Sequence, residues 1–296
     1  NIINKISLTN DQYSFKLVAN QPELLQYVES KINFEQLKTI DNFVISSFES
    51  LNLFNKIKKN NDLLDLYTKI VCGLTPYRLG KGLPKQTKEI VENRSFDSTF
   101  KVDESYLQYI MGRDFNKYTW NILENRFIKY GACLAEPRVK APFFEKKIVI
   151  RQTADRIIAN LDDNHFLSLK NVHNLKSINK NYSLNFILGI LNSTTVNWWY
   201  RKLIPEEGRI FAEVKVVNLK QLPIPKLTKD NQETHDAIIN LVDQMLSSKK
   251  QQQTAVTERD KSYLEAKCKN IDAQINDLVY AMYGLSAEEI AIVENS

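Results

Sequence analysis

Apolar residues at helical spacing mark the first part of the chain. From Phe48 to Ile57 an apolar side chain recurs every three residues, which predicts a helix with one buried face. Asp62 follows a break at Asn60-Asn61 and restarts a short helix. Pro22 begins another stretch, through Val28, that is typical of a short helix with proline in its first turn.

The end of the chain shows the same spacing over longer segments. One helix is predicted to begin near Thr234 and to stop before the polar segment 247–254, which favours a turn. A long helix then runs from about Val256 to Gly284, and the S-x-x-E capping box at Ser286 opens a last one. These elements predict an antiparallel helical hairpin.

The middle of the chain changes to the pattern of strands. Residues 146–153 (KKIVIRQT) and 156–162 (RIIANLD) are rich in β-branched side chains and predict a hairpin that turns at Ala154-Asp155. Residues 165–175 and 209–219 predict two more strands. Alternation along the first strand places Lys147, Val149 and Arg151 on one face, and Lys146, Ile148, Ile150 and Gln152 on the other.

Three further segments surround these strands. Residues 72–87 (CGLTPYRLGKGLPKQT) combine glycine and proline, which predicts a loop. Residues 182–203 (YSLNFILGILNSTTVNWWYRKL) are apolar around most of a helix, which predicts a helix buried between layers. The prolines of LPIP (222–225) are expected to stop any sheet pairing.

Composition indicates a globular protein of about two domains: the chain has 296 residues, 25% of them charged and 43% hydrophobic, with eight glycines and eight prolines. No apolar run reaches the ~18 residues of a membrane span. Cys72, Cys133 and Cys268 form no C-x-x-C pair, so a disulfide framework is not expected and a reducing cytoplasm fits best. The first segment, NIINKISLTN, lacks Met and a signal peptide, so we expect a piece of a longer protein.

Charge is unevenly distributed. Residues 1–70 carry 8 basic and 8 acidic side chains, residues 71–228 carry 25 and 15, and residues 229–296 carry 7 and 12. A basic middle before an acidic end favours a polyanion as the partner of the middle segment.

No catalytic or metal-binding constellation is evident. His165, His173 and His235 have no ligand spacing with cysteine or carboxylate, although the first two could meet across a hairpin. No G-x-S-x-G, Walker or G-x-G-x-x-G motif occurs. No metal is therefore expected in this chain.

Five segments in order resemble the specificity domain of TaqI-like adenine-N6 DNA methyltransferases and of fused type II restriction–modification enzymes. They are GLTPYRLGKGLPKQT, YIMGRDFNKYTW with its G-[RK]-D-x-x-[KR]-Y motif (Gly112 to Tyr118), KKIVIRQTADRIIANLD, ILGILNSTTVNWWYR and VKVVNLKQLPIPKL. The end, IDAQINDLVYAMYGLSAEEIAIVE, is similar to the helical end of such enzymes. The resemblance covers about residues 66–296.

The resemblance implies a domain that recognises a short sequence in double-stranded DNA and presents an adenine to a separate methyltransferase domain on its N-terminal side. That domain would bind S-adenosylmethionine and carry an (N/D/S)-P-P-(Y/F) motif. This chain contains no Pro-Pro dipeptide. We therefore expect no cofactor and no catalysis in the chain alone, while the parent enzyme would be a site-specific adenine methyltransferase, with or without nuclease activity.

Taken together, these features predict an α+β fold: a mixed β-sheet recognition domain with packed helices, followed by a C-terminal helical hairpin. The expected domains are a helical linker or trailing edge of the catalytic domain (1–68), a DNA target-recognition domain (69–228) and a helical region (229–296). Basic and amide side chains are expected to contact DNA, because they bind phosphates and the edges of guanine and adenine. The predicted DNA-binding residues are Lys81, Arg113, Lys117, Arg138, Lys146, Lys147, Arg151, Gln152, Arg156 and Arg209.

Other interpretations stay open at this point. A half-specificity subunit of a type I restriction system would combine the same parts, although such chains usually carry two recognition units. A helical protein-interaction module with an incidental basic patch would bind DNA weakly and without sequence preference. A stand-alone nuclease is disfavoured, because no P-D-x(n)-(D/E)-x-K pattern can be placed.

Overall fold

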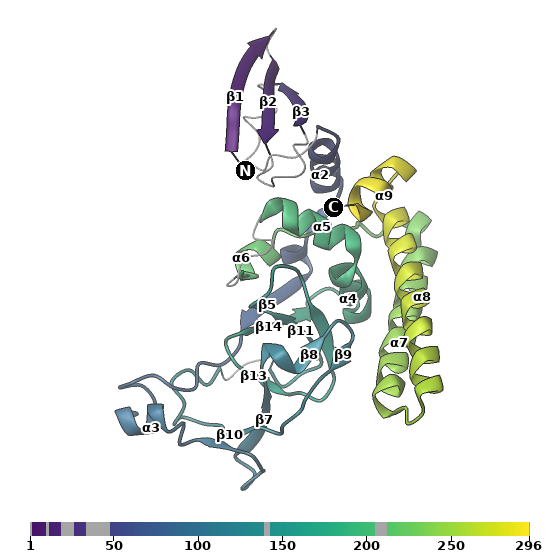
Figure 1. Ribbon diagram of the computed structural model, residues 1–296. Coiled ribbons are helices and arrows are strands. Elements are labelled where there is room, and N and C mark those ends of the chain that lie inside the picture. The colour runs from purple at the N-terminus through teal and green to yellow at the C-terminus, as the bar shows by residue number, and fades with distance from the viewer. Residues whose placement is uncertain are drawn as a thin grey trace.

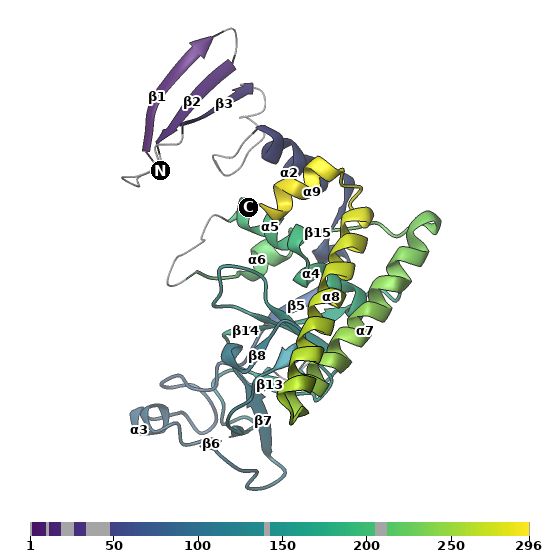
Figure 2. The same ribbon diagram turned by 45° about the vertical axis from the view of Figure 1, so that its right-hand side comes forward.

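The computed structural model describes residues 2–9, 12–18, 27–33, 48–138, 143–204 and 212–295. Figures 1 and 2 show a small sheet at one end, a central sheet with helices, a lower lobe of short strands, and a helical hairpin along one flank. Sheets and helices occupy separate layers, so the predicted α+β class is confirmed.

The first residues form an antiparallel sheet in the order β1-β2-β3 (Ile2–Thr9, Gln12–Val18 and Tyr27–Asn33). These residues are therefore strands, where helices were expected in a segment interpreted as a helical linker or the trailing edge of the catalytic domain. The helix expected over Pro22–Val28 lies mostly outside the described residues, and its last two positions belong to β3. The helix expected around Phe48–Ile57 is present as α2 (Phe48–Asn60).

The central sheet has the order β12-β11-β14-β5 and is antiparallel throughout. Its strands are β5 (Thr68–Cys72), β11 (Lys147–Arg151), β12 (Ala159–Asp162) and β14 (Val172–Ser177). The predicted hairpin is confirmed, with Lys147 opposite Asp162 and Ile150 opposite Ala159.

Both faces of β11 are covered. Ile148 and Ile150 belong to the main core, which they share with the buried helices α4 (Leu184–Asn192) and α5 (Thr194–Leu203). Val149 packs on the other face with Phe115 and Val172. The predicted alternation is confirmed. The strand β11, which carries the K-I-V-I-R segment, therefore lies between the main core on one face and the Phe115–Val172 cluster on the other.

The lower lobe consists of short elements joined by long loops (Figure 2). One sheet has the order β13-β7-β10-β6, and a small hairpin pairs β8 with β9. The bounds are α3 Lys88–Glu92, β6 Asp97–Ser98, β7 Tyr106–Ile110, η2 Gly112–Asp114, β8 Phe115–Asn116, β9 Thr119–Trp120, β10 Phe127–Lys129 and β13 Leu167–Ser168.

Two predictions for residues 209–225 are wrong. Residues 209–211 lie outside the described residues, and Val216–Leu219 form one helical turn, α6, where a strand was expected. The LPIP segment does pair: β15 (Pro223–Ile224) is antiparallel to β4 (Asp62–Leu63), which the turn η1 (Leu64–Leu66) follows in place of a full helix. Proline is tolerated here because the ladder has only two residues and both strands are edges.

The helical hairpin consists of α7 (Gln232–Thr254), which the turn η3 (Lys229–Asn231) precedes, and α8 (Glu258–Met282). The polar segment 247–254 continues α7, contrary to the predicted turn, because Gln and Lys are good helix formers and α8 supports the helix along its length. The capping box at Ser286 is confirmed and opens α9 (Ala287–Glu294), where Glu289 pairs with Lys56 of α2 at 2.5 Å.

Candidate nucleic-acid interface

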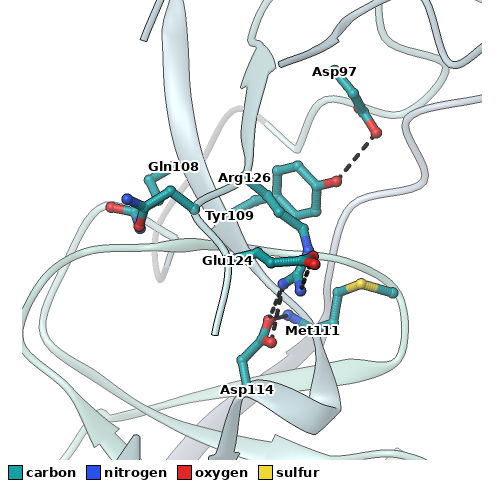
Figure 3. A network of polar contacts seen from close by, with 8 residues as sticks. Asp97, Gln108, Tyr109, Met111, Asp114, Glu124 and Arg126 are labelled. Atoms are coloured by element: carbon teal, nitrogen blue, oxygen red, sulfur yellow. Dashed lines mark hydrogen bonds and ion pairs between the residues drawn. The ribbon is translucent and has the colours of Figure 1, made fainter. Parts of the chain in front are cut away.

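The G-R-D motif is held by its aspartate. Asp114 is 2% exposed, and its carboxylate accepts a hydrogen bond from the backbone N–H of Met111 at 2.7 Å and from Arg126 at 2.8 and 3.0 Å (Figure 3). One guanidinium nitrogen of Arg126 thus donates to both carboxylate oxygens, and such charge-assisted hydrogen bonds are stronger than neutral ones. Asp114 therefore fixes the turn η2 to Arg126, the residue before β10, and has a structural role.

Arg113 is the exposed residue of this turn and forms no ion pair with a described residue. A Cβ atom placed on the neighbouring Gly112 would lie 3.4 Å from the carbonyl oxygen of Asn171 and 3.7 Å from Cγ of Arg151. The turn thus sits close against the end of β11 and the loop before β14, with Arg113 pointing to solvent beside them.

Arg151 and Gln152 are half-buried. The Arg151 Nε donates to the carbonyl oxygen of Phe115 at 3.0 Å, and its guanidinium lies 5.8 Å from the centre of the Phe115 ring. Burial lowers the pKa of Arg151. Arg151 therefore supports the β8 backbone, and Gln152, the next residue along the chain, is half-buried as well.

Lys147 is a core residue, which corrects its prediction as a DNA contact. Its side chain is 0% exposed and binds the Asp162 carboxylate at 2.5 Å and the carbonyl oxygens of Phe143 and Phe166. Burial lowers the pKa of Lys147 and raises that of Asp162, because removal from water disfavours each charge, while the contact between them opposes both shifts. DNA cannot reach this ammonium group without opening the core.

Lys117, a predicted DNA contact, is half-buried and has a structural role. Its Nζ donates to the backbone carbonyl of Asn192 at 2.7 Å, and burial lowers the pKa of Lys117. The Asn192 side chain in turn bonds to both the N–H and the carbonyl of Ala159, at 3.1 and 3.0 Å. The L-N-S motif therefore joins α4, β12 and the G-R-D segment.

The other predicted contacts lie at the surface in separate places. Arg138 pairs with Glu136 at 3.1 Å, and Arg156 pairs with Asp155 at 3.0 Å. Arg209 lies outside the described residues. Lys81 and Lys146 are exposed and have no ion pair with a described residue.

We define the open basic set as the exposed cations of residues 72–177 that form no ion pair with a described residue. These are Lys81, Lys85, Arg113, Lys129, Lys146 and Lys170. The predicted DNA-binding residues did not include Lys85, Lys129 and Lys170, because only the structure distinguishes a cation that is exposed and unpaired from one that is buried or paired.

A cavity of about 620 Å³ opens beside the Arg126 network. Tyr109 lines it and donates from its hydroxyl to Asp97 at 3.1 Å (Figure 3), while the side-chain amide of Gln108 donates to Asn125 at the rim. Burial raises the pKa of Tyr109, so its hydroxyl stays protonated as a donor. The cavity offers amide, hydroxyl and carboxylate groups, which are the groups that recognise base edges.

The histidines do not form a site. His173 is 1% exposed, its Nε2 lies 2.6 Å from the carbonyl oxygen of Val214, and its Nδ1 faces Cys72 on the neighbouring strand rather than His165. Among the described residues no group of three metal-ligating side chains occurs, and none of the described helices is long and apolar enough to cross a membrane.

His173 gives a pH-dependence that can be tested. Burial lowers its pKa below the usual 6.5 in the folded state. Below about pH 6.5 the unfolded chain then binds a proton that the folded chain does not, so the stabilising contribution of His173 is complete above this pH and declines as the pH falls.

We expect His173→Gln, which keeps a donor to Val214, to lose less stability than the unaltered chain between pH 7 and pH 5 in urea unfolding. His165→Asn is the control at an exposed histidine, and an unchanged pH profile for His173→Gln would contradict this assignment.

These features define a scaffold whose motif residues are buried and whose exposed loops are basic, as in a domain that recognises a polyanion. Residues 107–224 match the family model of the TaqI-like C-terminal specificity domain, which confirms for these residues the resemblance expected from the motifs. The match begins after the loop 72–87. A search of curated proteins finds no match.

The fold has a counterpart among solved structures. The Type IIL restriction-modification enzyme MmeI, solved in complex with DNA, superimposes with a TM-score of 0.54 at 14% sequence identity. The alignment covers 95% of this chain and 40% of the MmeI chain. This chain therefore corresponds to about two-fifths of that enzyme's length, and the likeness concerns the fold.

Proposed function

We propose that this chain is the DNA-recognition part of a restriction-modification enzyme. Its specificity domain binds a short sequence in double-stranded DNA and positions an adenine for N6 methylation by a separate S-adenosylmethionine-dependent domain. The observation that carries the proposal is the match of residues 107–224 to a specificity domain. The MmeI complex, in which a chain of the same fold is bound to DNA, supports it.

The electrostatics support the same function. Contacts to phosphates supply most of the affinity of a DNA-binding protein, and base contacts supply the sequence preference. The open basic set provides exposed cations that form no ion pair with a described acid, and it lies within the segment that carries 25 basic and 15 acidic residues. The acidic hairpin α7–α8 is suited to packing on α4 rather than to contacting DNA.

The burial of the family motifs also fits a specificity domain. Asp114, Lys117 and Asn192 hold the strands and helices together, so the loops between them can change without loss of the scaffold. Exposed loops on a rigid scaffold are where binding residues concentrate.

Selection of the purified chain against a randomised duplex pool, at low and near-physiological salt, tests the proposal. We expect an enriched sequence and an affinity that falls steeply with salt. Salt-dependent binding without an enriched sequence would show that the chain binds DNA phosphates, and would contradict sequence recognition by the chain alone. Absence of binding at low salt would contradict the proposal and favour the interaction-module alternative.

Arg113 is the variant with the clearest expectation. Arg113→Ala should weaken binding to the enriched duplex by about tenfold, because one arginine contact to a base or phosphate is lost at a cost of about 1–3 kcal/mol. If Arg113 contacts a base, the variant should lose its preference for one base pair of the enriched sequence. If Arg113 contacts a phosphate, the slope of the logarithm of the binding constant against the logarithm of the salt concentration (the salt slope) should fall by about one in magnitude. Arg259→Ala, on the exposed side of α8, is the matched control. If Arg113→Ala binds the duplex as tightly as the unaltered chain, Arg113 does not contact DNA.

A further inference from the structure

The loop formed by residues 78–86 is rigidly held. Gln86 is 2% exposed, and its side chain accepts from the backbone N–H of Arg78 and donates to the carbonyl oxygens of Pro76 and Cys133, each at 2.8 Å. Backbone hydrogen bonds from Gly80 to Gln86 and from Gln86 to Lys81 close the loop on itself. A buried amide with three backbone partners fixes the loop conformation before any ligand binds.

This rigid loop presents two large apolar side chains to solvent. Leu79 is 66% exposed and Leu83 is 73% exposed. Single exposed leucines are common on protein surfaces. Leu79 and Leu83 differ from such scattered leucines, because both lie on one loop. The buried side chain of Gln86 holds this loop in a conformation that keeps both leucines out of the core.

Cations accompany the leucines. Lys81 and Lys85 belong to the open basic set, and Arg78 lies 3.9 Å from Glu136, which it shares with Arg138. The backbone N–H of Leu83 donates to the carbonyl oxygen of Ala132, so the loop lies against residues 131–138. The leucines therefore project from a surface that favours a polyanion.

We propose that Leu79 and Leu83 form an apolar wedge that enters the minor groove of duplex DNA and partly unstacks one base step, while Lys81 and Lys85 bind the flanking phosphates. Apolar side chains between base steps, with cations beside them, are a general device for bending DNA from the minor groove. Insertion removes the two leucines from water, and the preformed loop avoids an ordering cost on binding. The inference rests on the proposed DNA-binding function and adds DNA distortion to it.

Fluorescence of 2-aminopurine tests the wedge, because the emission of this base rises when it unstacks. The probe is a short duplex of the enriched sequence with 2-aminopurine at each adenine in turn, mixed with the full chain. We expect a rise at one step with the unaltered chain. The double variant Leu79→Ser with Leu83→Ser should bind about tenfold more weakly, equivalent to about 1.4 kcal/mol, and should produce no rise at saturation.

Matched variants separate the parts of the proposal. Leu66→Ser removes a leucine that is 61% exposed in η1, at the opposite end of β5 from the loop, and should leave both signals unchanged. Lys81→Ala with Lys85→Ala should lower the salt slope by about two while the fluorescence rise at saturation persists. Leu83→Met keeps an apolar side chain and should keep the rise, which distinguishes a wedge from a general disturbance of the loop.

The outcomes distinguish the wedge from the function on which it rests. If the unaltered chain binds the duplex but no 2-aminopurine position changes, the wedge is wrong and DNA recognition stands. The wedge is also wrong if the leucine double variant binds and unstacks like the unaltered chain, which would favour a protein partner for the two leucines. Failure of the unaltered chain to bind DNA overturns the proposed function itself.

Discussion

Replacing Asp162 with leucine is expected to lower the free energy of unfolding by about 3–5 kcal/mol, because it leaves an unpaired ammonium group in the core. Lys147 and Asp162 are both 0% exposed and face each other across the β11–β12 hairpin at 2.5 Å. Without the carboxylate, Lys147 keeps only the carbonyl oxygens of Phe143 and Phe166 as partners.

A double variant separates the charge from the packing. Lys147→Met with Asp162→Leu should be more stable than Asp162→Leu alone, because a buried ion pair can be replaced by apolar side chains at little net cost while a single buried charge cannot. Equilibrium unfolding in urea measures each variant. Glu104→Leu, which removes the carboxylate of the exposed pair with Lys101, is the control and should leave the midpoint nearly unchanged.

A small effect of Asp162→Leu would show that water or a rearranged carbonyl group solvates the Lys147 ammonium group. A double variant no more stable than Asp162→Leu alone would contradict the buried-charge explanation. DNA affinity provides a second readout. Because Lys147 lies inside the core, the folded double variant should bind the enriched duplex as the unaltered chain does. If the folded double variant binds the duplex weakly, Lys147 contributes to DNA binding after all.

Gly189→Val is expected to destabilise the fold by about 2–3 kcal/mol through overpacking between α4 and α7. A Cβ atom at Gly189 would lie 2.9 Å from Cγ2 of Ile238 and 3.0 Å from Cγ2 of Val242, with Cγ2 of Ile275 at 3.9 Å. All three neighbours are β-branched side chains with few alternative rotamers. The helices must therefore separate to admit valine.

Urea unfolding measures the loss of stability, and hydrogen exchange along α7 and α8 shows whether the hairpin has moved away from α4. Ala266→Val places the same side chain on the exposed side of α8 and is the control. Protection of α7 equal to that in the unaltered chain would mean that the core accommodates the whole isopropyl group of valine, and would contradict the close approach of α4 to α7.

The family motifs were recognisable in the sequence, but their roles were not. The G-R-D and K-I-V-I-R segments are basic, which predicts DNA contacts from Arg113, Lys117, Lys147 and Arg151, whereas the L-N-S segment carries no such prediction. In the structure Asp114 binds Arg126, Arg151 binds the backbone of Phe115, and Asn192 binds the backbone of Ala159. Their polar atoms are paired inside the protein because a buried polar group without a partner is costly.

The sequence by itself determined the elements whose signal is local. The helix from Phe48, the hairpin of β11 and β12, the alternation along β11 and the capping box at Ser286 all follow from periodicity and short-range hydrogen bonds. The resemblance to a specificity domain also depends on residues close together in the chain, and the family match confirms it for residues 107–224.

The tertiary structure decided what depends on partners far apart in sequence. It covers both faces of β11, so Lys147 is buried against Asp162, while Arg113 on a turn outside the sheet stays exposed. It also pairs Pro223 with Leu63 and extends α7 along α8. A lysine has the same local pattern whether it is buried or exposed, and only the strands and helices packed around it determine whether its charge meets a carboxylate or the solvent.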